Sequence, residues 1–117
     1  MIIGIGVDLC SVERLSNSIQ RTPALAARLF TAKEQSLKDE SLAARFAAKE
    51  ALAKAAGNPK LLSWLEVEVV TDQLGKPRLV VSGKSAEALN SMGVLSTHLS
   101  LSHDNGFAIA MVVLEGN

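Results

Sequence analysis

The most regular stretch of the sequence reads LAARFAAKEALAKAA and covers residues 42–56. Nearly every residue in it is a strong helix former, and the GNP at residues 57–59 is typical of a helix end. The stretch therefore predicts one long helix, and the shorter patterns on either side of it decide what that helix packs against.

Strand patterns precede and follow the predicted helix. Residues 2–9 are rich in β-branched side chains and contain two glycines, which predicts a buried strand with close backbone packing. Residues 65–69 and 78–81 flank a turn at Gly75-Lys76-Pro77, and this order predicts a hairpin. A second hairpin is expected from residues 97–103 and 107–113, because Asp104-Asn105-Gly106 is a strong turn signal between them.

Helix signals fill the intervals. Ser11 can cap a helix that runs to about Arg21, and Thr31 and Glu34 have capping-box spacing. Another helix is expected over residues 84–91. The order predicts an α+β fold, a mostly antiparallel sheet packed against the long helix, in a single domain over residues 1–117.

Composition excludes several classes of protein. Twelve Lys and Arg balance twelve Asp and Glu, so the chain has no net positive charge to attract a nucleic acid. Three Phe, one Trp and no Tyr leave few aromatic side chains on which bases could stack, so nucleic-acid binding is not expected. No run approaches the ~18 apolar residues of a membrane span, and no export leader is evident, so we expect a cytoplasmic protein without a membrane segment. A chain this small gains buried surface by self-association, which makes an oligomer plausible.

Two carboxylates are candidate metal ligands. Asp8 ends the first predicted strand, where it either caps the next helix or points into a cleft. Glu50 lies in the long helix, where an ion pair with Lys54 four residues later is the simpler interpretation. If the fold brings them together, the two carboxylates suffice for Mg²⁺, which completes its shell with waters and phosphate oxygens.

Basic and imidazole side chains add candidates for binding an anion. Arg45 and Lys49 lie four residues apart on the long helix, and an anion would relieve their repulsion, although a solvated basic face is an equal alternative. His98 and His103 have odd spacing, so a regular strand puts them on opposite faces and they are not a joint metal pair. Cys10 is interpreted as a small apolar filler, and no P-loop, dinucleotide fingerprint or zinc spacing occurs.

Taken together, five segments resemble the holo-acyl-carrier-protein synthase family of small bacterial 4′-phosphopantetheinyl transferases. In order, they read IGIGVDL followed by Arg14 (residues 3–14), RLFTAKE (28–34), RFAAKEALAKA (45–55), GKP (75–77) and SLSHD (100–104). The stretch between Glu34 and Leu42 is shorter than in many relatives, which puts contacts from that loop in question.

The resemblance implies an enzyme that moves 4′-phosphopantetheine from coenzyme A to a serine of apo acyl carrier protein, in support of fatty acid biosynthesis. It implies a homotrimer with sites at subunit interfaces, and Mg²⁺ held by Asp8 and Glu50. The remaining roles that it implies are phosphate contacts of coenzyme A for Arg45, Lys49, Lys54 and His103, a place near the nucleotide for His98, and carrier binding for Arg14 and Arg21. Asp8, Glu50, Lys54 and His103 would form the catalytic set, with Asp104 able to orient His103.

The residues alone leave two rival functions open. One is a Mg²⁺-dependent phosphohydrolase of small nucleotides that uses the same acidic pair and basic helix and needs no protein acceptor. The other is a non-enzymatic module in which Arg14 and Arg21 dock an acidic partner and Glu50 merely pairs with Lys54. The acceptor of the serine proton also stays open among Asp8, His103 and a bound water.

Overall fold

The computed structural model describes all residues, 1–117. The helices and strands follow one another as β1 (Ile2–Ser11), α1 (Val12–Arg21), α2 (Ala24–Leu29), α3 (Ala32–Gln35), α4 (Asp39–Ala56), β2 (Val67–Thr71), β3 (Pro77–Val81), α5 (Gly83–Ser91), β4 (Ser96–Asp104) and β5 (Phe107–Glu115). Two short 3-10 turns, Pro59–Leu61 and Trp64–Glu66, link α4 to β2. None of the helices has the length and apolarity that a bilayer crossing requires.

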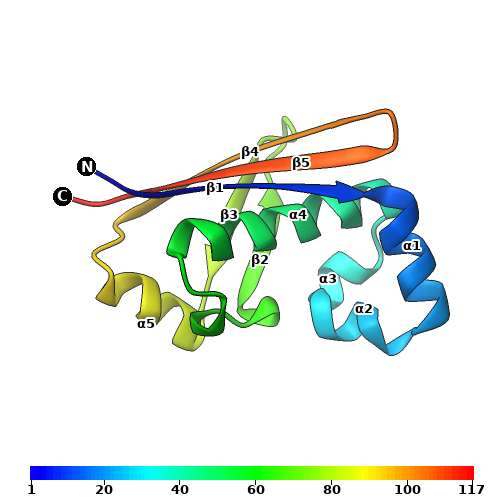
Figure 1. Cartoon of the computed structure of the whole chain (residues 1–117), viewed down its shortest axis with the longest axis horizontal. Coiled ribbons are helices and arrows are strands. Elements are labelled where there is room, and N and C mark those ends of the chain that lie inside the picture. The colour runs from blue at the N-terminus through cyan, green and yellow to red at the C-terminus, as the bar shows by residue number, and fades with distance from the viewer.

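The strands form two antiparallel sheets rather than one. A three-stranded sheet has the order β1-β5-β4, and β2 and β3 pair as a separate hairpin. The two chain ends lie side by side at one end of the large sheet (Figure 1), where the Met1 ammonium donates to the Gly116 carbonyl at 2.8 Å. The α+β class and the antiparallel pairing are confirmed, and the single sheet is corrected to two.

Helix α4 packs along one face of the three-stranded sheet (Figure 1). Its approach to β1 depends on two glycines, because a Cβ built on Gly4 would lie 2.0 Å from the Ala55 carbonyl oxygen, and one on Gly6 would lie 1.9 Å from that of Ala51. Such distances exclude any side chain at these positions. The predicted close packing at the two glycines is confirmed, and it fixes the depth at which β1 and α4 meet.

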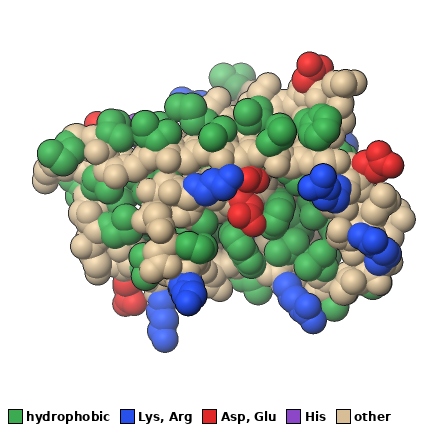
Figure 2. All heavy atoms as spheres, viewed as in Figure 1, with side chains coloured by type: hydrophobic (Ala, Val, Ile, Leu, Met, Phe, Trp, Pro, Cys, Tyr) green, Lys and Arg blue, Asp and Glu red, His purple; other side chains and the backbone are tan.

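The expectation that residues 2–9 form a buried strand is wrong for one face of β1. The glycine face contacts α4, but Ile5, Val7 and Leu9 on the other face are 62%, 51% and 62% exposed. Successive side chains of a strand point to opposite faces, and only one face of this sheet is covered by a helix. Figure 2 shows apolar side chains in a row along this side of the molecule.

The local signals that predicted turns and helix starts are confirmed. Asn105 and Gly106 link β4 to β5 with positive φ values of 52° and 80°, as a tight hairpin turn requires. The Ser11 hydroxyl accepts from the Arg14 backbone at the start of α1. Thr31 and Glu34 form a full capping box at α3.

Candidate active site

A carboxylate, a second carboxylate and an ammonium meet where β1 crosses α4. Asp8 lies on the helix-facing side of β1, and Lys54 donates to its Oδ1 at 2.9 Å and to the Val7 carbonyl at 3.2 Å. Glu50 lies one turn before Lys54 on α4, close enough to Asp8 for their charges to interact. Lys54 therefore pairs with Asp8 rather than with Glu50, and Ser11 rather than Asp8 caps α1.

The electrostatics of this cluster favour a bound cation. Partial burial raises the pKa of the Glu50 carboxyl, the neighbouring charge of Asp8 raises this pKa further, and Lys54 opposes the shift. The same acidic surroundings add to burial in raising the pKa of the Cys10 thiol. Two carboxylates that share a single ammonium thus hold an unbalanced negative charge. A divalent cation would remove that imbalance.

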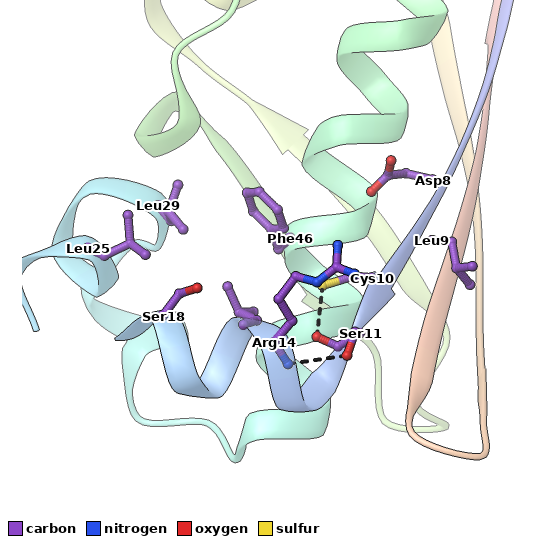
Figure 3. A pocket seen from close by; sticks show the side chains of 10 residues that line it. Asp8, Leu9, Cys10, Ser11, Arg14, Ser18, Leu25, Leu29 and Phe46 are labelled. Atoms are coloured by element: carbon purple, nitrogen blue, oxygen red, sulfur yellow. Dashed lines mark hydrogen bonds between the residues drawn. The ribbon is translucent and has the colours of Figure 1, made fainter. Parts of the chain in front are cut away.

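A pocket of about 290 Å³ opens beside Asp8, and its lining is mainly apolar. It lies between β1, the helices α1 and α2, and Phe46 of α4 (Figure 3). Arg14 reaches from α1 towards the end of β1 in the same view. The acidic cluster is therefore flanked by an apolar hollow and by an arginine.

The structure contradicts the expected phosphate contact of Lys49. This side chain is fully buried, and its ammonium donates to Glu34 Oε1 at 2.6 Å and to the carbonyls of Leu29 and Trp64 at 2.8 and 3.1 Å. An ammonium has three protons, so these acceptors satisfy it completely. Glu34 is the anion that relieves the repulsion between Lys49 and Arg45.

Arg45 keeps a free donor. Its side chain is partly exposed, and its Nε is buried without a hydrogen-bond partner. Arg45 therefore remains a candidate for an anion, whereas Lys49 does not.

The two histidines lie on opposite faces of β4, as their spacing predicts. His103 pairs in register with the buried Ala108, and His98 with Val113. His98 contacts Glu115 at 2.9 Å and lines a polar pocket of about 540 Å³ together with Lys76 and Arg78. The GKP segment and His98 thus share one polar pocket, which Asp72 also lines.

His103 has a partner that sequence reasoning did not suggest. Its Nδ1 lies 2.6 Å from Oε1 of Glu40, in the first turn of α4. Asp104 makes no ion pair with it, because neighbouring residues of a strand point to opposite faces. The idea that Asp104 orients the imidazole is therefore wrong. Asp8 lies on β1 and His103 on β4, the two outer strands of the sheet.

Arg14 and Arg21 lie seven residues apart on α1, which is two helical turns, and both are exposed. A shallow polar hollow that includes Glu13 and Asn17 lies between them. Arg14 also lines the pocket beside Asp8, so this surface adjoins the acidic cluster. No cluster of three or more metal-ligating side chains occurs.

Two acidic residues were not identified from the sequence as partners of site candidates. Glu34 was predicted only as part of a capping box, and its role as the partner of Lys49 has no local signal. Glu40 lies 63 positions before His103 and belongs to no motif. A tertiary contact of this kind needs the fold before it can be seen.

Comparisons with known proteins match both the sequence and the fold of this chain to one family. A sequence model described as the 4′-phosphopantetheinyl transferase superfamily matches residues 4–112. A holo-[acyl-carrier-protein] synthase of Clavibacter michiganensis is 53% identical over 117 residues, which cover 100% of this chain and 98% of the relative. The crystal structure of the synthase of Neisseria meningitidis superposes with a TM-score of 0.90 at 35% identity, over 98% of this chain and 99% of the other.

A third comparison concerns a structure that contains a ligand. The holo-[acyl-carrier-protein] synthase of Helicobacter pylori, solved in complex with coenzyme A, has a TM-score of 0.84 at 32% identity. The match covers 95% of this chain and 99% of the other. Since the family model and full-length relatives agree, this chain belongs to the 4′-phosphopantetheinyl transferase superfamily.

Proposed function

We propose that this protein transfers 4′-phosphopantetheine from coenzyme A to a serine of apo acyl carrier protein and releases adenosine 3′,5′-bisphosphate. The observation that carries the proposal is the meeting of Asp8, Glu50 and Lys54 in a chain of this superfamily. The full-length match to named holo-[acyl-carrier-protein] synthases supports the choice of donor and acceptor. The cytoplasm, where coenzyme A is available and the single cysteine stays a thiol, is the proposed location.

The acidic pair fits magnesium. Asp8 and Glu50 repel one another in the protein alone, and Mg²⁺ commonly takes two carboxylates and leaves other positions to phosphate and water. When bound, the ion supplies charge neutralisation on the pyrophosphate of coenzyme A. Asp8 and Glu50 would hold it, and Lys54 keeps Asp8 in place from α4.

The protein's own cations act on the phosphates. The carrier serine gives its hydroxyl proton to one of the candidate acceptors, Asp8, His103 or a bound water. Its oxygen forms a bond to the β-phosphorus, the bond from that phosphorus to the bridging oxygen breaks, and the bisphosphate takes the electron pair. Lys54, whose side chain is 56% exposed, can stabilise the negative charge that develops on the leaving bisphosphate. The partly exposed guanidinium of Arg45 supplies donors for a phosphate oxygen.

The nucleotide end of coenzyme A fits the polar pocket at the GKP segment. Lys76, Arg78 and His98 line this pocket, and together they suit a phosphorylated ribose. The named coenzyme A complex of the Helicobacter pylori relative supports this choice of ligand. Arg14 and Arg21 would meet the acidic carrier protein, since exposed arginines two turns apart present a local positive surface on a neutral protein.

We also propose a homotrimer. The outer face of the large sheet exposes six large apolar side chains, and no helix covers them; they are Ile5, Val7, Leu9, Phe107, Ile109 and Met111. An uncovered apolar sheet face of this size is typical of a subunit interface. Within one chain, His103 on β4 and Asp8 on β1 lie on opposite outer strands of the sheet. Association would let His103 of one copy act beside the acidic cluster of another copy. Analytical ultracentrifugation tests this, and a monomer at working concentration contradicts it.

Intact-mass spectrometry tests the transfer. Apo acyl carrier protein is incubated with this protein, coenzyme A and Mg²⁺, beside a chelator control and a carrier that lacks the acceptor serine. We expect the mass of one phosphopantetheinyl group to be gained only in the complete reaction. Cleavage of coenzyme A without a gain in carrier mass would instead support the phosphohydrolase, and carrier binding with neither event would support the binding module.

A further inference from the structure

The first turn of α4 carries two carboxylates that do not cap the helix. Lys38 is the N-cap residue, and no side chain accepts from the free backbone donors there. Asp39 instead accepts from the Ser16 hydroxyl at 3.0 Å, and Glu40 contacts His103 on β4. Acidic residues in the first turn normally interact with their own helix end. Here both are directed to neighbouring elements.

The contact of Glu40 decides which nitrogen of His103 is free. Nδ1 lies 2.6 Å from the carboxylate oxygen, a distance at which a nitrogen lone pair would repel it. Nδ1 therefore carries the proton, and Nε2 is the ring atom left for a ligand. The His103 side chain is 54% exposed and makes no other ion pair, so the ligand can reach it.

The contact also joins His103 to the first turn of α4. His103 comes one residue before the end of β4, next to the Asn105–Gly106 turn. Without a partner, its ring would be free to rotate about two side-chain bonds. Glu40 stands in the first turn of α4, so the contact fixes the imidazole relative to that end of the helix. Glu40 is the only acidic side chain that makes an ion pair with His103, and Asp104 makes none with it.

We propose that Glu40 is a positioning residue for the transferase reaction, which holds His103 by Nδ1 and presents the unprotonated Nε2 as an acceptor to a hydroxyl group of coenzyme A. The inference rests on the proposed function. Glu40 itself touches no substrate, and its effect passes entirely through the His103 ring. Any consequence of removing Glu40 must therefore vanish when His103 is absent.

The first test reads the ring directly and needs no activity. Two-dimensional ¹⁵N NMR of histidine-labelled protein is recorded for the wild type, Glu40→Ala, and Glu87→Ala as a control at an exposed position of α5. We expect a protonated Nδ1 in the wild type and the control, and a shift towards protonated Nε2 in Glu40→Ala. An unchanged His103 spectrum in Glu40→Ala overturns the proposal.

The second test measures whether the effects of Glu40 and His103 on the KM for coenzyme A depend on one another. We expect Glu40→Ala to raise the KM for coenzyme A by roughly 3- to 10-fold, the range for one hydrogen-bonded group, with an unchanged melting temperature. In a His103→Ala background the same substitution should change nothing further. An effect of Glu40→Ala that persists in that background overturns the proposal. If His103→Ala alone leaves transfer unchanged, the role of His103 and this inference both fail, while the transferase activity itself stands.

Discussion

Replacing Lys49 by Met removes the cation of the buried pair and leaves the Glu34 carboxylate, which is 2% exposed, inside the core. Loss of one partner of a buried pair commonly costs about 3–5 kcal/mol. Glu34 retains the backbone donors of Thr31 and Val69 at 3.0 and 3.1 Å, so we expect a loss near the lower limit, about 3 kcal/mol. For a chain of this size that corresponds to a fall in melting temperature of roughly 10 °C.

Thermal and urea unfolding measure this loss, and the double variant Glu34→Gln/Lys49→Met is the matched control. With the carboxylate neutralised as well, part of the stability should return, because the two single losses share one interaction. Below its melting temperature, Lys49→Met should keep a KM for coenzyme A within about twofold of the wild type, since its ammonium faces the core. A melting temperature equal to that of the wild type, or a large rise in KM, would refute the assignment of Lys49 to the core.

Three further predictions concern the site and its supports. Gly6→Ala should unfold at clearly lower temperature, because its Cβ would meet the Ala51 carbonyl oxygen; an unchanged melting temperature would contradict the close contact. Glu50→Gln should stabilise the metal-free protein at pH 7, because the pKa of Glu50 is raised and its charged form lowers the free energy of unfolding. The stability difference between variant and wild type should disappear below pH 4.5, the ordinary pKa of a glutamate, where both side chains are neutral. Equal stabilities of the two proteins at pH 7 would contradict the raised pKa. Arg14→Glu should raise the KM for the carrier, and added salt should narrow the gap to the wild type; a KM equal to that of the wild type at low salt would remove Arg14 from the carrier surface.

Local signals in the sequence predicted those parts of the fold that depend on neighbouring residues. The helix over residues 42–56, the Asn105–Gly106 turn and the Thr31 capping box all follow from short-range geometry, and the structure confirms them. The two glycines of β1 predicted a close approach, which Ala51 and Ala55 of α4 make. These features required no knowledge of tertiary contacts.

The features that the sequence did not predict depend on which face of a helix or strand packs into the core. Spacing placed Arg45 and Lys49 on one face of α4 but did not reveal that Lys49 points into the core. The partners Glu34 and Glu40 come from elsewhere in the chain, so their roles became visible only when the helix met α3 and β4. The exposed face of β1 was missed for the same reason.

The carrier mass assay, repeated with Asp8→Asn and Glu50→Gln beside Lys49→Met, tests the central claim most directly. We expect both carboxylate variants to be folded, as circular dichroism would verify, and to add no phosphopantetheinyl group to the carrier within the time that the wild type needs for completion. Lys49→Met should modify the carrier. Turnover near that of the wild type in either carboxylate variant would contradict the assignment of Asp8 and Glu50 to the reaction.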